Sequence, residues 1–95
     1  MIERDGSVLR VGGPLTIASV GALADAGKQQ FGEGAELVVD FSGATEVDSA
    51  ALSLMFEWQR EARRRDMRIS FRSLPASLES LATLYGVSEL IAASA

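Results

Sequence analysis

Short apolar runs with two different spacings predict strands and helices that alternate along the chain. Residues 37–41 form a bounded run rich in β-branched side chains, which is typical of a strand buried on both faces. Residues 67–72 alternate apolar and polar side chains, as a half-buried strand does. Residues 2–12 hold the turn dipeptide Asp5-Gly6 between two extended runs, so they predict a β-hairpin that ends at Gly12-Gly13-Pro14.

Apolar residues at helical spacing predict three helices between and after these strands. Thr16 can cap the first helix, which should stop at residues 32–34, where two glycines flank a glutamate. The second helix should run from Ser49 to Arg65. The third should begin near Pro75, because proline suits the first turn of a helix.

This order of elements predicts a single α/β domain over residues 1–95, with a small mixed sheet of about four strands and helices packed on one face. Strand 37–41 should lie in the centre of the sheet. The predicted core joins the apolar sides of the strands and helices. It contains Leu23, Phe31, Val38, Phe41, Leu52, Phe56, Ile69, Phe71, Leu78 and Leu81.

One side of the second helix should face the solvent. At about 100° per residue, Leu52 and Phe56 fall on the core side, with Trp58 at its flank. The opposite side is small and partly apolar: it carries Ala50, Ser53, Leu54 and Glu57. An isolated exposed residue such as Leu54 is common in proteins, whereas grouped apolar surface often marks an interaction site, and the sequence leaves both interpretations open.

The residues that precede this helix are polar. Residues 42–46 predict a tight loop, and Asp48 and Ser49 follow it. Both are good N-cap residues, because their side-chain oxygens can accept hydrogen bonds from free amides of the first turn. The start of a helix also carries partial positive charge, so it is a candidate docking point for a protein partner or an anionic group.

Composition and charge exclude several kinds of site. The chain has no cysteine and no histidine, which excludes disulfides and removes the usual zinc ligands, the cysteine nucleophile and the commonest general base. We therefore expect no catalysis, no cofactor and no metal. A net charge of −4 argues against nucleic-acid binding, which needs a basic face.

The distribution of apolar residues also indicates where in the cell the protein resides. No apolar run approaches the roughly 20 residues that a transmembrane helix needs. Residues 1–5 are charged and lack the apolar segment of a signal peptide. We expect the protein to be cytoplasmic.

One basic cluster stands out in this acidic chain. It suits the C-terminal end of the second helix, where cations are favoured, and Glu61 can pair with one of its members four residues on. Contact with anionic lipid or phosphate is the alternative, which the negative net charge disfavours. The cluster consists of Arg60, Arg63, Arg64, Arg65 and Arg68.

A longer motif carries a family resemblance. Asp40-Phe41-Ser42 is followed, after a five-residue gap, by Asp48 and then Ser49-Ala50-Ala51-Leu52. With Gly13-Pro14-Leu15 before the first helix and residues 81–87 near the end, this resembles STAS domains over nearly the whole chain. STAS domains include anti-sigma-factor antagonists, the tails of sulfate transporters, and the MlaB subunits of Mla phospholipid-transport ABC systems.

The arrangement Ser49-Ala50-Ala51 is most similar to MlaB. The resemblance implies a subunit that catalyses nothing and binds the cytoplasmic ABC ATPase of a phospholipid transporter, at the inner face of the inner membrane. It implies a role in outer-membrane lipid asymmetry and contact with the membrane only through the complex. The implied partner-binding residues are Asp48, Ser49, Ala50, Ser53, Leu54, Glu57 and, at the margin, Trp58.

An alternative within the family is an anti-sigma-factor antagonist. There the motif usually reads Asp-Ser-Ser-Gly, and the second serine is phosphorylated by a partner kinase. Ala50 stands at that position and has no hydroxyl, so an antagonist of this type would either be unphosphorylated or use Ser49 or Ser53. A third functional class is direct binding of a nucleotide or lipid by this domain. The absence of a phosphate-loop motif from the sequence argues against it.

Overall fold

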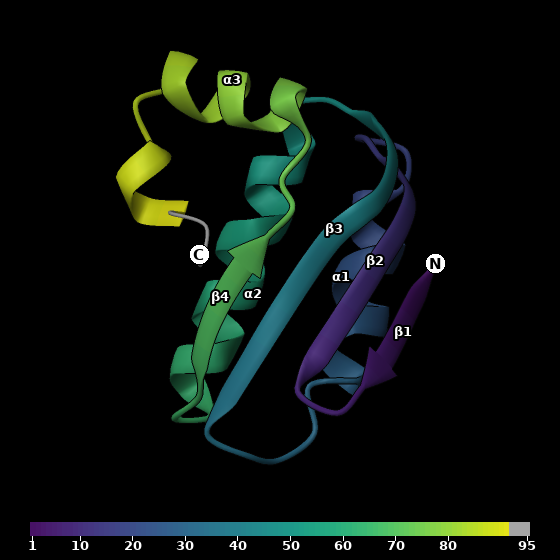
Figure 1. Cartoon of the computed structure of the whole chain (residues 1–95), viewed down its shortest axis with the longest axis vertical. Helices are drawn as coiled ribbons and strands as arrows, with labels where there is room; N and C mark the ends of the chain where they lie inside the picture. The colour runs from purple at the N-terminus through teal and green to yellow at the C-terminus, as the bar shows by residue number, and fades with distance from the viewer. Residues whose placement is uncertain (92–95) are drawn as a thin grey trace.

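The computed structural model describes residues 1–91, so the last four residues of the predicted domain 1–95 lie outside the described part. Four strands and three helices follow one another in the predicted order, and a short 3-10 helix ends the described chain (Figure 1). The elements are β1 (Ile2–Asp5), β2 (Val8–Leu15), α1 (Val20–Gln29), β3 (Glu36–Val47), α2 (Ala50–Arg64), β4 (Arg68–Arg72), α3 (Ala76–Leu84) and η1 (Ser88–Ile91).

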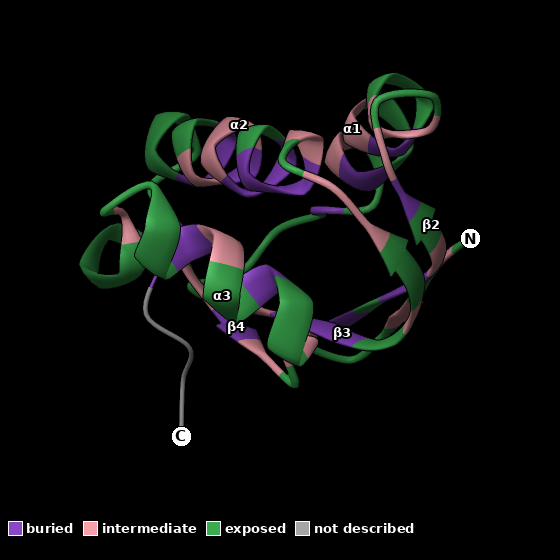
Figure 2. Ribbon diagram, turned by 90° about the horizontal axis from the view of Figure 1, so that it is seen from above, coloured by how far each residue is buried: buried purple, intermediate pink, exposed green. Residues whose placement is uncertain are grey.

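The strands form one mixed sheet in the order β1-β2-β3-β4. The β1–β2 hairpin is antiparallel, whereas β3 pairs in parallel with β2 on one side and with β4 on the other. Both crossover connections advance in the same direction across the sheet. Right-handed crossovers therefore place α1 and α2 on the same face, as Figure 2 shows. The predicted sheet, its central strand and its one helix-covered face are confirmed.

Strands β2 and β3 are longer than predicted. β2 does not end at residues 12–14, and the predicted loop at 42–46 is part of β3. The two strands continue side by side, with Gly12 opposite Gly43 and register shifts around Gly12 and Pro14. A Cβ atom at Gly43 would lie 3.2 Å from the Cα atom of Gly12, so glycine at position 43 permits this close approach. Residues 12–14 are glycine and proline and residues 42–46 are mostly polar or small, so neither segment shows the apolar alternation that predicts a strand.

One face of the sheet packs against the helices and the other is not covered by a helix (Figure 2). Leu9, Val39 and Phe71 occupy one row across β2, β3 and β4, and all three are buried. Val38 lies one position along β3 on the other face and is only half-buried. The prediction that strand 37–41 is buried on both faces, and with it the core position of Val38, is therefore wrong.

Most of the remaining predicted core is confirmed. Leu78 is buried on α3, which lies beyond the end of the sheet at the top of Figure 1. Phe56, Ile69 and Leu81 are half-buried and pack against the core rather than within it. Fully or nearly fully buried side chains from the predicted set are Leu23, Phe31, Phe41, Leu52, Phe71 and Leu78.

The buried side of α2 is rotated from the predicted one. Leu54, expected in solvent, is only 2% exposed, and Trp58, expected at the flank, is 0% exposed. The cause is α1, against which α2 packs as well as against the sheet. A Cβ atom at Gly27 would lie 2.3 Å from the Trp58 ring, so the missing side chain makes the space that the indole fills. The indole nitrogen donates to the carbonyl oxygen of Ala24 at 3.2 Å.

Candidate functional site

Asp48 joins two loops at the end of the sheet where α2 begins. Its Oδ1 atom accepts a hydrogen bond from the amide of Ala50 at 2.8 Å, and its Oδ2 atom accepts one from the amide of Ile17 at 3.0 Å. Its own amide donates to the carbonyl oxygen of Leu15 at 3.2 Å. One carboxylate thus fixes the β2–α1 loop against the start of α2.

Ser49 occupies the N-cap position of α2 but makes no side-chain capping bond. Its predicted role as a cap is wrong, because Asp48, one residue earlier, supplies the acceptor through both its side chain and its main-chain oxygen. The Ser49 side chain remains exposed. Thr16 also fails to cap α1 with its side chain, and the N-cap position there belongs to Ser19.

The first amides of α2 are already bonded within the protein. Ala50 donates to the Asp48 carboxylate, Ala51 donates to the Asp48 carbonyl oxygen, and Leu52 donates to the Ser49 carbonyl oxygen. An anion at this helix start would therefore compete with existing acceptors instead of meeting free donors. The geometry favours a protein partner over an anionic group at this point.

Small side chains form the outer surface of this first turn. Ser49 and Ser53 are exposed, and Ala50 is half-buried, while Ala51 and Leu52 beneath them are buried. We call Ile17, Ser49, Ala50 and Ser53 the α2 docking surface. Its backbone is held in place and its side chains are short, except for Ile17.

Ile17 was missed by the sequence reasoning. It lies in the β2–α1 loop, is 80% exposed, and has its main chain tied to Asp48. A large aliphatic side chain held in solvent beside the start of α2 adds apolar area that a partner can bury. Its spacing hid it, because Ile17 lies three residues before Val20 and seven before Ala24, in line with the apolar side predicted for the first helix.

The other predicted partner-binding residues lie along the contact between α1 and α2. Glu57 is half-buried and pairs with Arg60 at 2.6 Å and with Lys28 at 3.1 Å. These partners, Arg60 first, lower the pKa of the Glu57 carboxyl below its usual range. Leu54 lines a groove of about 410 Å³ between the two helices with little of its surface exposed. Leu54 and Trp58 belong to the interior and offer no surface to a partner.

Asp40, from the motif, serves the fold and lies away from the docking surface. Its Oδ1 atom accepts from the amide of Ser42 at 2.8 Å, and its Oδ2 atom pairs with Arg72 at 3.1 Å on the open face of the sheet. Burial alone would raise the pKa of Asp40, but hydrogen bonds from Ser42 and Arg72 outweigh it and hold the pKa below the usual range.

Among residues 1–91, no group of three or more carboxylate, histidine or cysteine side chains is arranged to hold a metal ion. No helix within the same residues combines the length and the apolar character needed to cross a membrane.

Comparison with protein families identifies the fold. A family model described as "Mlab, STAS domain" matches residues 2–92. The chain belongs to the STAS domain family. The STAS fold is also present in the solved structure of the anti-sigma factor antagonist SpoIIAA in its unphosphorylated form. That structure matches with a TM-score of 0.74 over 100% of this chain and 87% of the other, at 15% sequence identity.

At this identity the likeness to SpoIIAA establishes the STAS fold alone. The comparison with curated proteins gave no match.

Proposed function

We propose that this STAS domain is a non-catalytic subunit that binds the ATPase of an ABC-type phospholipid transporter of the Mla kind and stabilises or regulates it. It would act in the cytoplasm at the inner face of the inner membrane and reach the membrane only through the complex. Its role would be to help maintain outer-membrane lipid asymmetry. The family description and the MlaB-like sequence Ser49-Ala50-Ala51 support this proposal.

The observation that carries the proposal is the α2 docking surface. A partner helix or loop can approach closely over Ser49, Ala50 and Ser53, because their side chains are small and two of them are exposed. Ile17 beside them supplies an apolar contact. The hydrogen bonds of Asp48 fix this backbone before binding, so little conformational entropy is lost when a partner docks.

The proposal expects an ABC ATPase gene near the gene for this chain, and the test is association with that ATPase. Ala50→Arg and Ser53→Arg each place a long cation on the docking surface, and both should abolish co-purification with the ATPase. Both positions lie on the outer side of a helix, so circular dichroism should show an unchanged fold. Arg64→Gln changes an exposed side chain near the other end of α2 and serves as the matched control.

Two results would contradict the proposal. One is that folded Ala50→Arg and Ser53→Arg proteins co-purify with the ATPase as well as the wild-type chain does. The other is that the neighbouring genes encode a sigma factor and a kinase in place of a permease, an ATPase and a substrate-binding protein.

The second candidate is an anti-sigma-factor antagonist, which the fold shared with SpoIIAA favours. Ala50 cannot accept a phosphate, so a phosphorylation switch would have to use Ser49 or Ser53, whose side chains are both exposed. Incubation with a kinase encoded nearby, followed by mass spectrometry, separates the two candidates. We expect no stoichiometric phosphate, and stoichiometric phosphate on Ser49 or Ser53 would promote the second candidate.

A further inference from the structure

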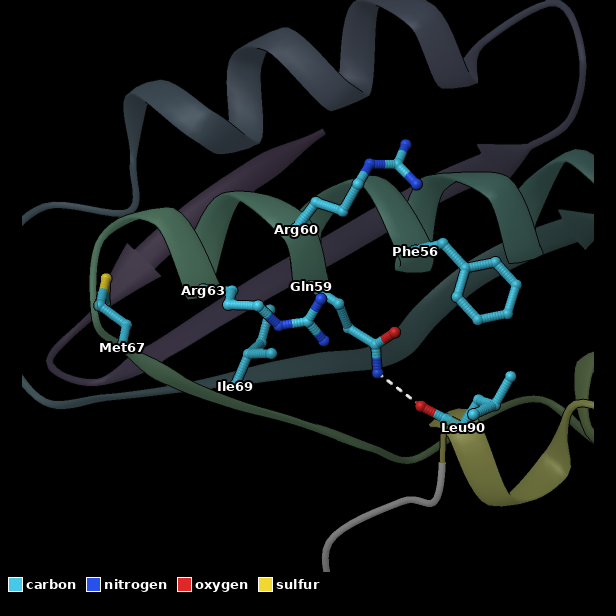
Figure 3. Close-up of a pocket in the computed structure, with 7 residues that line it drawn as sticks. All are labelled: Phe56, Gln59, Arg60, Arg63, Met67, Ile69 and Leu90. Carbon is cyan, nitrogen blue, oxygen red and sulfur yellow. Dashed lines mark hydrogen bonds between the residues drawn. The ribbon is translucent and has the colours of Figure 1, made fainter.

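A second groove lies on the flank of α2 that faces β4 and η1, away from α1. It has a volume of about 580 Å³, and apolar side chains line it together with Gln59, Arg60 and Arg63. Figure 3 shows Gln59 and Arg63 extending from α2 toward β4 and η1, whereas Arg60 extends the other way. The apolar residues of the groove are Phe56, Met67, Ile69 and Leu90.

The groove has a fixed wall. The Gln59 side-chain amide donates to the main-chain carbonyl oxygen of Leu90 at 2.6 Å, which holds η1 against α2. Leu90 itself is 63% exposed, and Phe56 and Ile69 are half-buried. Apolar surface is thus left uncovered along a groove whose two sides are tied together.

Arg63 differs from every other arginine of the basic cluster. Arg64 and Arg65 pair with Glu61, Arg60 pairs with Glu57, and Arg68 pairs with Glu36. Within residues 1–91, Arg63 has no ion pair or side-chain hydrogen bond, and no carboxylate lines the groove. In a chain of net charge −4, this exposed guanidinium is a cation with no carboxylate partner among residues 1–91, and it lies beside the apolar residues of the groove.

We infer that this groove binds a short acidic peptide segment of a partner protein. An apolar side chain of the peptide would cover Phe56, Ile69 and Leu90, and an aspartate or glutamate beside it would pair with Arg63. A guanidinium suits this contact because its planar donors match a carboxylate in a bidentate pair.

A peptide fits the groove better than an anionic membrane surface does. Holding anionic lipid takes four to eight basic residues on one surface, whereas the groove offers one unpaired arginine in an acidic protein. A peptide needs only local complementarity of shape and charge. This site is independent of the proposed ATPase contact, because it lies on the other flank of α2.

The experiment is selection from a displayed library of random peptides of about twelve residues, followed by affinity measurements on the enriched peptides. We expect enrichment of sequences with aspartate or glutamate next to leucine, isoleucine or phenylalanine. Arg63→Gln should weaken their binding about tenfold, since one charge-assisted pair is lost. Arg64→Gln removes the same charge one residue on and should leave the affinity unchanged.

Two further arms complete the test. Leu90→Ala should also weaken binding, and because Leu90 is mostly exposed, the fold should survive this change. Flotation with phosphatidylglycerol vesicles should show no binding by the wild-type chain. The inference is overturned if no acidic peptide is enriched, if Arg63→Gln and wild type bind the peptides equally, or if vesicles bind in an Arg63-dependent manner.

Discussion

The two ends of α2 are built in opposite ways. At the C-terminal end, Glu61 is buried and accepts hydrogen bonds from Arg64 at 2.8 Å and Arg65 at 2.7 Å. The Arg65 guanidinium also lies 5.4 Å from the centre of the Phe31 ring. At the N-terminal end, Ser49 and Ser53 are exposed, and among residues 1–91 neither side chain makes a hydrogen bond.

On the side of α2 that faces α1, the C-terminal end holds the fold, whereas the N-terminal end leaves its short side chains exposed to a partner. Trp58 and Arg65 donate to main-chain carbonyl oxygens of α1. Arg64 and Arg65 both bond to Glu61. Arg63 lies on the other flank of α2 and has none of these contacts. At the N-terminal end the backbone is fixed by Asp48 while the surface stays small and available. A rigid surface with few committed side chains is suited to docking, because little must rearrange or desolvate when a partner arrives.

The largest expected effect is a loss of stability when the packing of α2 against α1 is disrupted. Trp58→Ala should lower the free energy of unfolding by about 3–5 kcal/mol, since it empties the space beside Gly27 and removes the hydrogen bond from the indole to the Ala24 carbonyl oxygen. Phe56→Ala removes a half-buried ring and should cost only about 1–2 kcal/mol. Urea unfolding of both variants decides the matter. Equal losses would mean that the buried side of α2 is not centred where we place it.

Asp48 should matter next, for stability and for binding together. Asp48→Ala removes the acceptor for two amides, so we expect a loss of about 1–2 kcal/mol in urea unfolding and weaker association with the ATPase. Ser49→Ala is the neighbouring control, and it should change stability by less than about 0.5 kcal/mol. Loss of stability with undiminished association would show that the β2–α1 loop plays no part in docking.

Acid should weaken the C-terminal end of α2. The hydrogen bond from Arg65 lowers the pKa of the Glu61 carboxyl from its ordinary value of 4.5, an effect larger than that of burial, and Arg64 contributes further. Because the folded pKa lies below the unfolded one, Glu61 stabilises the fold above about pH 4.5 and loses this effect as pH falls through the folded pKa.

Glu61→Gln should therefore lower stability at neutral pH and flatten the acid side of a stability-against-pH curve from urea unfolding. Glu79→Gln, at an exposed position on α3, is the matched control and should keep the wild-type curve. An unaltered acid dependence in Glu61→Gln would show that the ion pairs of Glu61 do not stabilise the protein.

The smallest effect should come from Arg64→Ala. The Arg64 side chain that pairs with Glu61 is mostly exposed to solvent. Without it, Arg65 still bonds to the Glu61 carboxylate. Stability should change by less than about 1 kcal/mol, and association with the ATPase should not change. A loss of association comparable to that of Ala50→Arg would extend the partner surface along the whole of α2.

The spacing of apolar residues predicted the strands and helices, because the repeat of a strand or helix involves only residues close together in the sequence. The order of elements, the mixed sheet and the central place of residues 37–41 follow from spacing that is visible in the sequence. Asp48 was a candidate cap on the same grounds, since a carboxylate before a helix meets free amides within two or three residues.

What only the tertiary structure decided is which side of each element is covered. Leu54 and Trp58 are buried because α1, distant in sequence, presents Gly27 to them, and the period of α2 alone does not reveal a second packing surface. Val38 is half-exposed because both crossovers place their helices on one face of the sheet. Ile17 joins the docking surface through a hydrogen bond across 31 residues, which no local period encodes.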